Sequence, residues 1–135
     1  MTAPRRPSPP RPPQMAITFL YYRDLPRAVA FYRDVMGFRP AIDQGALAQI
    51  LHIAGDAHVG LVDEARGMNR WQAEKCVQLC IRVSDLDAWH DHLGARGVEG
   101  LTAPRVNRAI GIRAFVLRDP EGYQIEVQEA LCDTP

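Results

Sequence analysis

The sequence has 135 residues, of which 47% are hydrophobic, and this is enough to bury the core of one domain. Sixteen basic residues balance sixteen acidic ones, so the composition indicates neither a nucleic-acid-binding protein nor one held at an anionic membrane. No apolar run approaches the roughly 20 residues of a membrane-spanning helix. The three cysteines are read as reduced thiols, and we expect a cytoplasmic protein.

The first fourteen residues differ from the rest of the chain. Six of them are proline and three are arginine, with almost no apolar side chain to bury. Such a composition favours extended, solvated polyproline II over a packed fold. We therefore expect residues 1–14 to form a disordered tail. The spacing of Arg6, Pro9 and Pro12 leaves a proline-rich docking segment open as an alternative.

The folded part is predicted to begin with a strand at residues 16–22, which are rich in β-branched and aromatic side chains. Asp24 is suited to cap a following helix, Pro26 fits its first turn, and Gly37 ends it. Three short strands then follow, at residues 38–42, 46–54 and 57–62.

The second half of the chain repeats this order after a linker at residues 63–75, where periodicity is lost. A strand at 76–83 leads into Asp85-Leu86 just as the first strand leads into Asp24-Leu25. A helix is predicted over 86–96, and it is followed by strands near 98–103, 112–118 and 123–130. A repeat of this kind predicts two copies of one unit packed together.

These elements predict an α+β fold with two βαβββ modules, at residues 15–62 and 76–131, in a single domain 15–135. The layout resembles the vicinal oxygen chelate superfamily, which contains glyoxalase I, the extradiol dioxygenases, the fosfomycin-resistance transferases and the bleomycin-resistance binding proteins. The resemblance rests on Phe31-Tyr32 before Gly37-Phe38, and on the turn Asp119-Pro120-Glu121-Gly122 before Glu126. It implies a curved mixed sheet around a cleft, with the helices on the convex side.

Metal-using members of this superfamily hold a divalent ion with four side chains on the concave face. The positions that correspond here are Ile17, Gly60, Gln78 and Glu126. Isoleucine and glycine offer no ligand atom, and an amide with one carboxylate selects poorly for a transition metal. We therefore expect no metal and no cofactor. A divalent ion held by substitute ligands, such as His58, stays open as the alternative.

Strand alternation predicts which side chains face the cleft. An apolar wall is expected from Ile17, Phe19 and Tyr21. A polar strip is expected opposite it, with the side chains His58, Gln78, Cys80, Arg82, Gln124, Glu126 and Gln128. Across the turn at Gly55-Asp56, alternation also places Gln49, Leu51 and Ile53 in the cleft, whereas His52 is expected to point toward the helix.

Three functions are compatible with this sequence. The first is a metal-independent binding protein that holds an aromatic or cationic small molecule in the cleft of a homodimer. The second is an enzyme of the lyase, isomerase or dioxygenase kind, with Glu126 as the catalytic base or a metal ligand. The third is a partner-binding domain whose contact segment is the tail at residues 1–14. Neither nucleic acid nor a membrane is expected as a partner.

Overall fold

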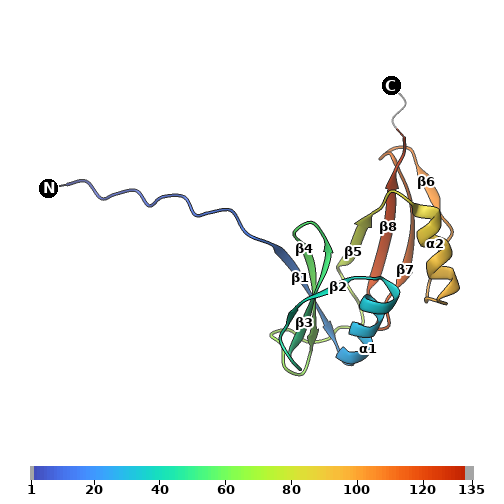
Figure 1. The fold of residues 1–135 in the computed structure, drawn as a ribbon, viewed down its shortest axis with the longest axis horizontal. Coiled ribbons are helices and arrows are strands. Elements are labelled where there is room, and N and C mark those ends of the chain that lie inside the picture. The colour runs from blue at the N-terminus through green and yellow to red at the C-terminus, as the bar shows by residue number, and fades with distance from the viewer. Residues whose placement is uncertain (1, 133–135) are drawn as a thin grey trace.

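The computed structural model describes residues 2–132. Met1 of the predicted tail and residues 133–135 of the predicted domain lie outside the described residues. The first module contains β1 (Ala16–Tyr22), α1 (Leu25–Ala30), a π-helical turn η1 (Phe31–Val35), β2 (Arg39–Asp43), β3 (Ala48–Ala54) and β4 (Ala57–Asp63). The second contains β5 (Gln78–Arg82), α2 (Leu86–Ala95), β6 (Arg105–Asn107), β7 (Ile112–Arg118) and β8 (Gln124–Ala130). The α+β class and the two βαβββ modules are therefore confirmed (Figure 1).

Each module forms its own four-stranded mixed sheet. Sheet 1 has the order β1-β4-β3-β2, and sheet 2 has the matching order β5-β8-β7-β6. In each sheet the first and last strands of the module pair in parallel, as β1 with β4 and β5 with β8, and the other pairs are antiparallel. The repeat seen in the sequence is thus a repeat of strand topology.

Helix α1 begins where the sequence predicts. The Asp24 side chain accepts a hydrogen bond from the Arg27 N–H at 3.2 Å, and Pro26 lies in the first turn. The helix then widens into η1, which the 3.6-residue periodicity did not predict. It ends at Gly37, whose φ of +75° is a left-handed conformation that glycine adopts without strain.

One predicted strand is misplaced. Residues 98–103 make only an isolated bridge, between Glu99 and Arg118, and β6 instead lies at Arg105–Asn107. The physical reason is Gly100, whose φ of +66° interrupts the extended chain. The edge strand of sheet 2 therefore starts later than alternation of side chains indicates.

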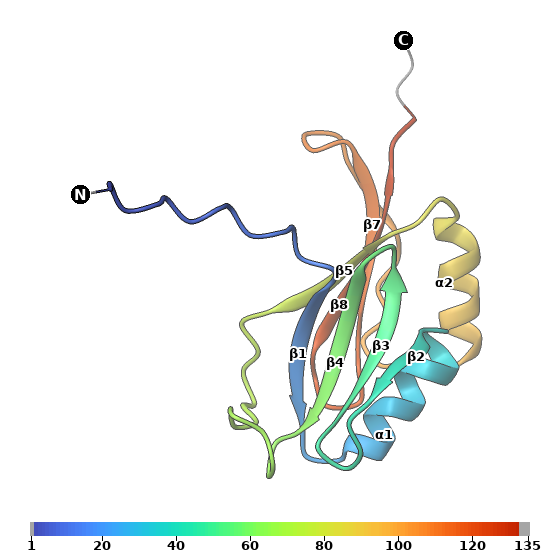
Figure 2. The ribbon, with the colours of Figure 1, turned by 60° about the vertical axis from the view of Figure 1, so that its left-hand side comes forward.

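The core lies between the sheets and the helices. In the first module Leu20 and Tyr22 of β1 face α1, and in the second Ile125 and Val127 of β8 face α2. These side chains belong to one continuous apolar cluster that runs through both modules. The two helices lie end to end on one side of the molecule (Figure 2). His92 of α2 donates to the carbonyl oxygen of Val35 at 2.8 Å, which joins them.

A buried polar cluster also joins the modules. The hydroxyls of Tyr22 and Tyr32 donate to Asp119 Oδ2 at 2.5 and 2.8 Å, and Asp119 is only 1% exposed. The other carboxylate oxygen, Oδ1, accepts the backbone N–H groups of Glu121 and Tyr123 at 2.9 and 3.0 Å. The buried carboxylate is therefore fully hydrogen-bonded, as buried charge requires.

Residues 2–14 contain no helix or strand, are exposed, and run away from the body as an extended segment (Figures 1 and 2). The roles expected for this tail stay predictions. Among the described residues, no helix has the length and apolar character needed to cross a bilayer.

Candidate functional site

The predicted apolar wall lies on the face of sheet 1 that points away from α1. Ile17, Phe19 and Tyr21 alternate there with the core side chains of β1, as expected. Phe19 is 44% exposed, which is high for a phenylalanine. Through the parallel register, Ile17 lies beside His58 and Phe19 lies beside Gly60.

The Phe19 ring covers Gly60. A Cβ atom added to Gly60 would lie 2.5 Å from Phe19 Cε1 and 3.1 Å from Ile17 Cγ2. The first distance is far below carbon–carbon van der Waals contact. The space in which a side chain at position 60 would project is therefore filled by aromatic carbon.

The expectation for β3 was wrong. Gln49, Leu51 and Ile53 were placed in the cleft, but Leu51 is 1% exposed in the core and the other two share its side of the strand. Ile50 and His52 lie on the predicted cleft face instead, because they pair directly with Gly60 and His58, and Ile50 is buried there at 1% exposure. The register shifts between His52 and Ala54, and one extra residue in a strand moves every later side chain to the opposite face.

His58 is on the predicted face but is occupied by the turn beside it. Its Nδ1 hydrogen-bonds to the carbonyl oxygen of Asp56 at 3.0 Å, and it is 8% exposed. His52 makes the corresponding bond from Nε2 to the carbonyl oxygen of Gly55 at 2.8 Å. The two imidazole rings pack edge to face, 5.2 Å apart, so both serve to hold the β3–β4 turn.

The predicted polar strip lies on the corresponding face of sheet 2, directed away from α2. The strand register arranges its side chains in four rows across the sheet. These rows are Gln78–Gln124–Arg118, then Cys80–Glu126–Val116, then Arg82–Gln128–Ala114–Arg105, and last Ala130–Ile112–Asn107. The sequence therefore placed Gln78, Cys80, Arg82 and Glu126 on one surface correctly.

Hydrogen bonds connect the polar side chains of this face. The Arg82 guanidinium donates to Gln128 Oε1 at 2.8 and 2.6 Å, and Gln128 Nε2 in turn donates to Glu126 Oε2 at 2.9 Å. The Cys80 thiol donates to the same Glu126 oxygen at 3.2 Å. Gln124 Nε2 donates to Gln78 Oε1 at 2.6 Å. Glu126 is thus held by neutral donors.

Cys80 is a poor nucleophile in this setting. Burial, together with the adjacent Glu126 carboxylate, raises the pKa of the Cys80 thiol to about 11. A thiolate is the reactive form, so Cys80 is almost entirely protonated and inert at neutral pH. Its role on this face is that of a hydrogen-bond donor.

A groove of about 470 Å³ opens beside Glu126. Sequence reasoning missed several of its lining residues, above all Arg105 and Val116. Arg105 was missed because β6 was predicted too early in the chain, which left position 105 outside any strand. The groove contains none of the apolar-wall residues of sheet 1. Within one chain, the two predicted halves of the cleft therefore do not line this groove together.

Two of the family's four metal positions carry no donor side chain in this protein. Ile17 and Gly60 lie on sheet 1 and provide no donor atoms, while Gln78 and Glu126 lie on the separate sheet 2. Among residues 2–132, no group of three or more histidine, cysteine, aspartate or glutamate side chains is placed to hold an ion. The donor set does not fit a hexacoordinate divalent metal.

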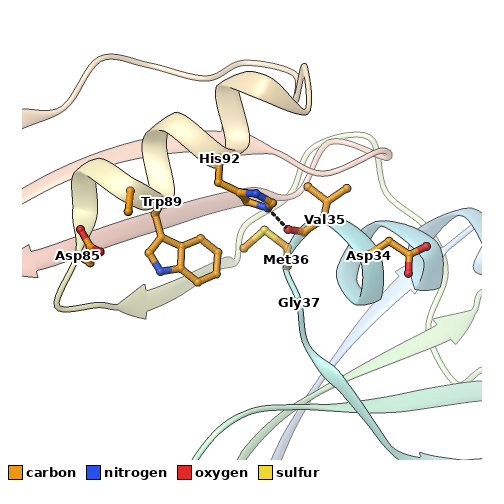
Figure 3. A pocket seen from close by; sticks show the side chains of 8 residues that line it. Asp34, Val35, Met36, Gly37, Asp85, Trp89 and His92 are labelled. Atoms are coloured by element: carbon orange, nitrogen blue, oxygen red, sulfur yellow. Dashed lines mark hydrogen bonds between the residues drawn. The ribbon is translucent and has the colours of Figure 1, made fainter.

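A second groove, of about 450 Å³, lies on the helix side of the molecule. Figure 3 shows Trp89 and His92 of α2 facing Met36 at the end of η1, with Asp34 and Asp85 at its two ends. None of the site residues predicted from the sequence lines it. It is therefore separate from the candidate site.

Comparisons with known proteins agree with this architecture. The family model Glyoxalase/Bleomycin resistance protein/Dioxygenase superfamily matches residues 14–127. No curated protein matches the chain significantly. The chain is 25% identical to the lactoylglutathione lyase of Agrobacterium tumefaciens, with a TM-score of 0.69, covering 88% of this chain and 96% of that one. For TioX of Micromonospora sp. ML1, the identity is 27%, the TM-score is 0.70, and the coverage is 87% and 98%.

The fosfomycin resistance protein FosX of Listeria monocytogenes shares the fold, with a TM-score of 0.71, 15% identity, and coverage of 89% of this chain and 95% of that one. These matches confirm the resemblance first indicated by Phe31-Tyr32 and by the turn at Asp119. The protein therefore belongs to the Glyoxalase/Bleomycin resistance protein/Dioxygenase superfamily.

Proposed function

We propose that this protein binds a small aromatic or cationic organic molecule without a metal. The observation that carries the proposal is the contact of Phe19 with Gly60, where relatives of the metal-using kind place a ligand. Aromatic carbon fills that space, and Ile17 beside it adds hydrocarbon rather than a donor atom. An apolar wall and a polar, hydrogen-bonded strip together suit an organic ligand with a few donors.

We further propose that two copies of the chain complete the cleft as a homodimer. In one chain, the apolar face of sheet 1 and the groove beside Glu126 are separate surfaces. A second copy that placed its sheet 2 against sheet 1 would cover Phe19 and enclose the polar strip. Large side chains that are exposed in one chain support this packing, among them Phe19 at 44% and Ile110 at 65%. Sedimentation equilibrium is expected to give twice the chain mass.

Thermal unfolding with added compounds tests the binding function. A ligand that binds only the native state raises the midpoint, by mass action. We expect aromatic or cationic compounds to raise it equally with and without EDTA, and we expect Zn²⁺, Ni²⁺ and Mn²⁺ alone to leave it unchanged. One tightly held divalent ion per chain, found by elemental analysis of protein purified without chelator, would overturn the proposal.

A second candidate is an enzyme that uses Glu126 as its base. The similarity to a lactoylglutathione lyase supports it, as does the position of Glu126 at a groove open to a ligand. Formation or loss of the lactoylglutathione thioester, followed by absorbance, tests this activity directly. Turnover that disappears in Glu126→Gln, while binding persists, would favour the enzyme.

The three cysteines of the chain are free thiols, and we propose that the protein works in the reducing cytoplasm. Fractionation of the producing cells, followed by immunoblotting, tests this localisation.

A further inference from the structure

The polar face of sheet 2 carries more positive than negative charge. Arg118 lies in its first row, Glu126 in its second, and Arg82 and Arg105 in its third. Ion pairs do exist elsewhere in the chain, as between Arg113 and Asp87 at 2.9 Å. Among residues 2–132, none of the three arginines on this face has a carboxylate within 4.0 Å.

The hydrogen bonds of these arginines go to neutral groups. Arg82 donates to the amide oxygen of Gln128, and Arg118 donates to the carbonyl oxygen of Gly122 at 3.1 Å. Glu99 pairs with Arg118 through the backbone and Glu74 lines the neighbouring groove, but neither forms an ion pair with it. The positive charge of the face is therefore not neutralised from within the chain.

The proposed homodimer does not neutralise it either. The face of sheet 1 that a second copy would bring opposite has no carboxylate. Its side chains are Ile17, Phe19, Tyr21, Ile42, Ala48, Ile50, His52, His58 and Val62, together with Arg39 of β2, which adds a further positive charge. Enclosing three guanidinium groups against such a wall costs free energy, unless an anion enters with them.

Arg105 is the cation that shares a groove with Glu126. The groove that these two residues line also has apolar walls, from Ile110, Ile112 and Val116. Its volume of about 470 Å³ is in the range of small-molecule sites. A guanidinium next to an apolar wall can bind a carboxylate or sulfonate through two parallel hydrogen bonds, while the wall holds the rest of the molecule.

We infer that the ligand is an aromatic organic acid, whose acidic group is bound by Arg105 in the groove beside Glu126. Arg82 and Arg118 lie outside the groove on the same face of sheet 2 and raise the positive potential that attracts the acid. Glu126 faces the remainder of the ligand, where it accepts a hydrogen bond. This inference rests on the proposed binding function; it selects the aromatic ligand class and adds an acidic group.

Three fluorescent dyes test this inference. 1-Anilinonaphthalene-8-sulfonate is an aromatic acid, N-phenyl-1-naphthylamine is the same molecule without the sulfonate, and acridine orange is an aromatic cation. Titration of the full chain in EDTA is expected to give at least tenfold tighter binding of the sulfonate than of the neutral dye. Added salt should weaken the binding of the sulfonate alone, since salt screens charges.

Substitutions locate the acid-binding residue. Arg105→Gln should weaken sulfonate binding about tenfold, and Arg105→Lys should restore only part of it, since the charge is retained but the two parallel hydrogen bonds are lost. Arg27→Gln makes the same change on α1, on the opposite side of the sheets, and should leave binding unchanged. Circular dichroism of each variant confirms that it is folded.

Equal binding of the sulfonate and the neutral dye would overturn the inference, as would unchanged sulfonate binding in Arg105→Gln. Tightest binding of acridine orange in EDTA would also overturn it, although the proposed metal-independent function would stand. Dye binding that appears only after a divalent metal is added would instead overturn the proposed function.

Discussion

The hydroxyl of Tyr32 donates a hydrogen bond to Asp119 at 2.8 Å, although 87 positions separate the two residues in the chain. The two sequence motifs that indicated the family, Phe31-Tyr32 and the turn that begins at Asp119, therefore meet in one buried contact. Tyr22 reaches the same carboxylate oxygen. The motifs mark the junction of the two modules, and the residues proposed to bind a ligand lie elsewhere.

Tyr32→Phe is expected to lower the free energy of unfolding by about 2 kcal/mol, because a buried carboxylate loses one of its donors. Asp119→Asn should lower the free energy of unfolding further. The NH2 group of the new amide would face hydroxyl or N–H groups that are themselves hydrogen-bond donors. Urea denaturation measures both. Asp87→Asn is the control: Asp87 is 70% exposed in its ion pair, so a change within about 0.5 kcal/mol is expected. Equal losses in all three variants would argue against the junction.

Alkaline pH is expected to destabilise the protein through Tyr22 and Tyr32. Burial, together with the neighbouring Asp119 charge and phenol groups, raises the pKa of both tyrosines well above the usual value. The unfolded chain loses these protons near pH 10, whereas the folded chain keeps them. These two tyrosines should therefore leave stability unchanged below about pH 9 and lower it steadily above about pH 10.

Urea midpoints between pH 8 and 11.5 measure this fall. Tyr22→Phe removes one titrating group, so its stability should decline less steeply than that of the parent chain. A parallel decline in the two proteins would show that Tyr22 titrates at its ordinary pKa.

Cys80 should be the slowest cysteine to alkylate. Its pKa of about 11 leaves little thiolate at pH 8, and Cys132, which is exposed as Cys80 is, serves as the internal control. Iodoacetamide treatment followed by peptide mass spectrometry measures both sites. Glu126→Gln should speed the reaction of Cys80, since the carboxylate raises the pKa of the thiol, but desolvation of the thiol still raises that pKa and keeps Cys80 slower than Cys132. Modification of Cys80 first would contradict this view of the face.

Gly60→Ala is expected to destabilise the protein by about 1–3 kcal/mol, because the new methyl group overlaps the Phe19 ring. Phe19→Ala in the same chain should recover much of that loss. Gly94→Ala is a matched control: its Cβ would lie 3.8 Å from the nearest atom, inside helix α2, so this change should be neutral or stabilising. Thermal unfolding of the parent, Gly60→Ala, Phe19→Ala and the double variant measures the coupling, and additive effects would show that Phe19 does not limit position 60.

The fold could be predicted from the sequence where the periodicity of the apolar residues agrees with the capping and turn residues at the ends of the elements. Strand β1 lies at the predicted residues 16–22, and α1 begins after the predicted cap at Asp24. The predictions failed where one backbone irregularity shifts the alternation of side chains along a strand. A register shift next to His52 places the side chains of β3 on the face opposite to the predicted one. The left-handed Gly100 makes β6 begin later in the chain than predicted. Neither the register shift nor the glycine conformation changes the pattern of polar and apolar residues in the sequence.

The candidate site was predictable in part, for the same reason. Gln78, Cys80, Arg82 and Glu126 lie on regular strands, so alternation placed them on one face. Arg105 lies on the misplaced strand and was missed. The cluster around Asp119 depends on contacts between residues far apart in the chain, which no local pattern contains.

The overlap between Phe19 and Gly60 also links these two positions in evolution. A histidine at position 60 would need the exposed Phe19 ring to move aside, or position 19 to change to a smaller residue. A smaller residue at position 19 would in turn remove aromatic surface from this face of sheet 1. Substitutions at positions 19 and 60 are therefore expected to occur together.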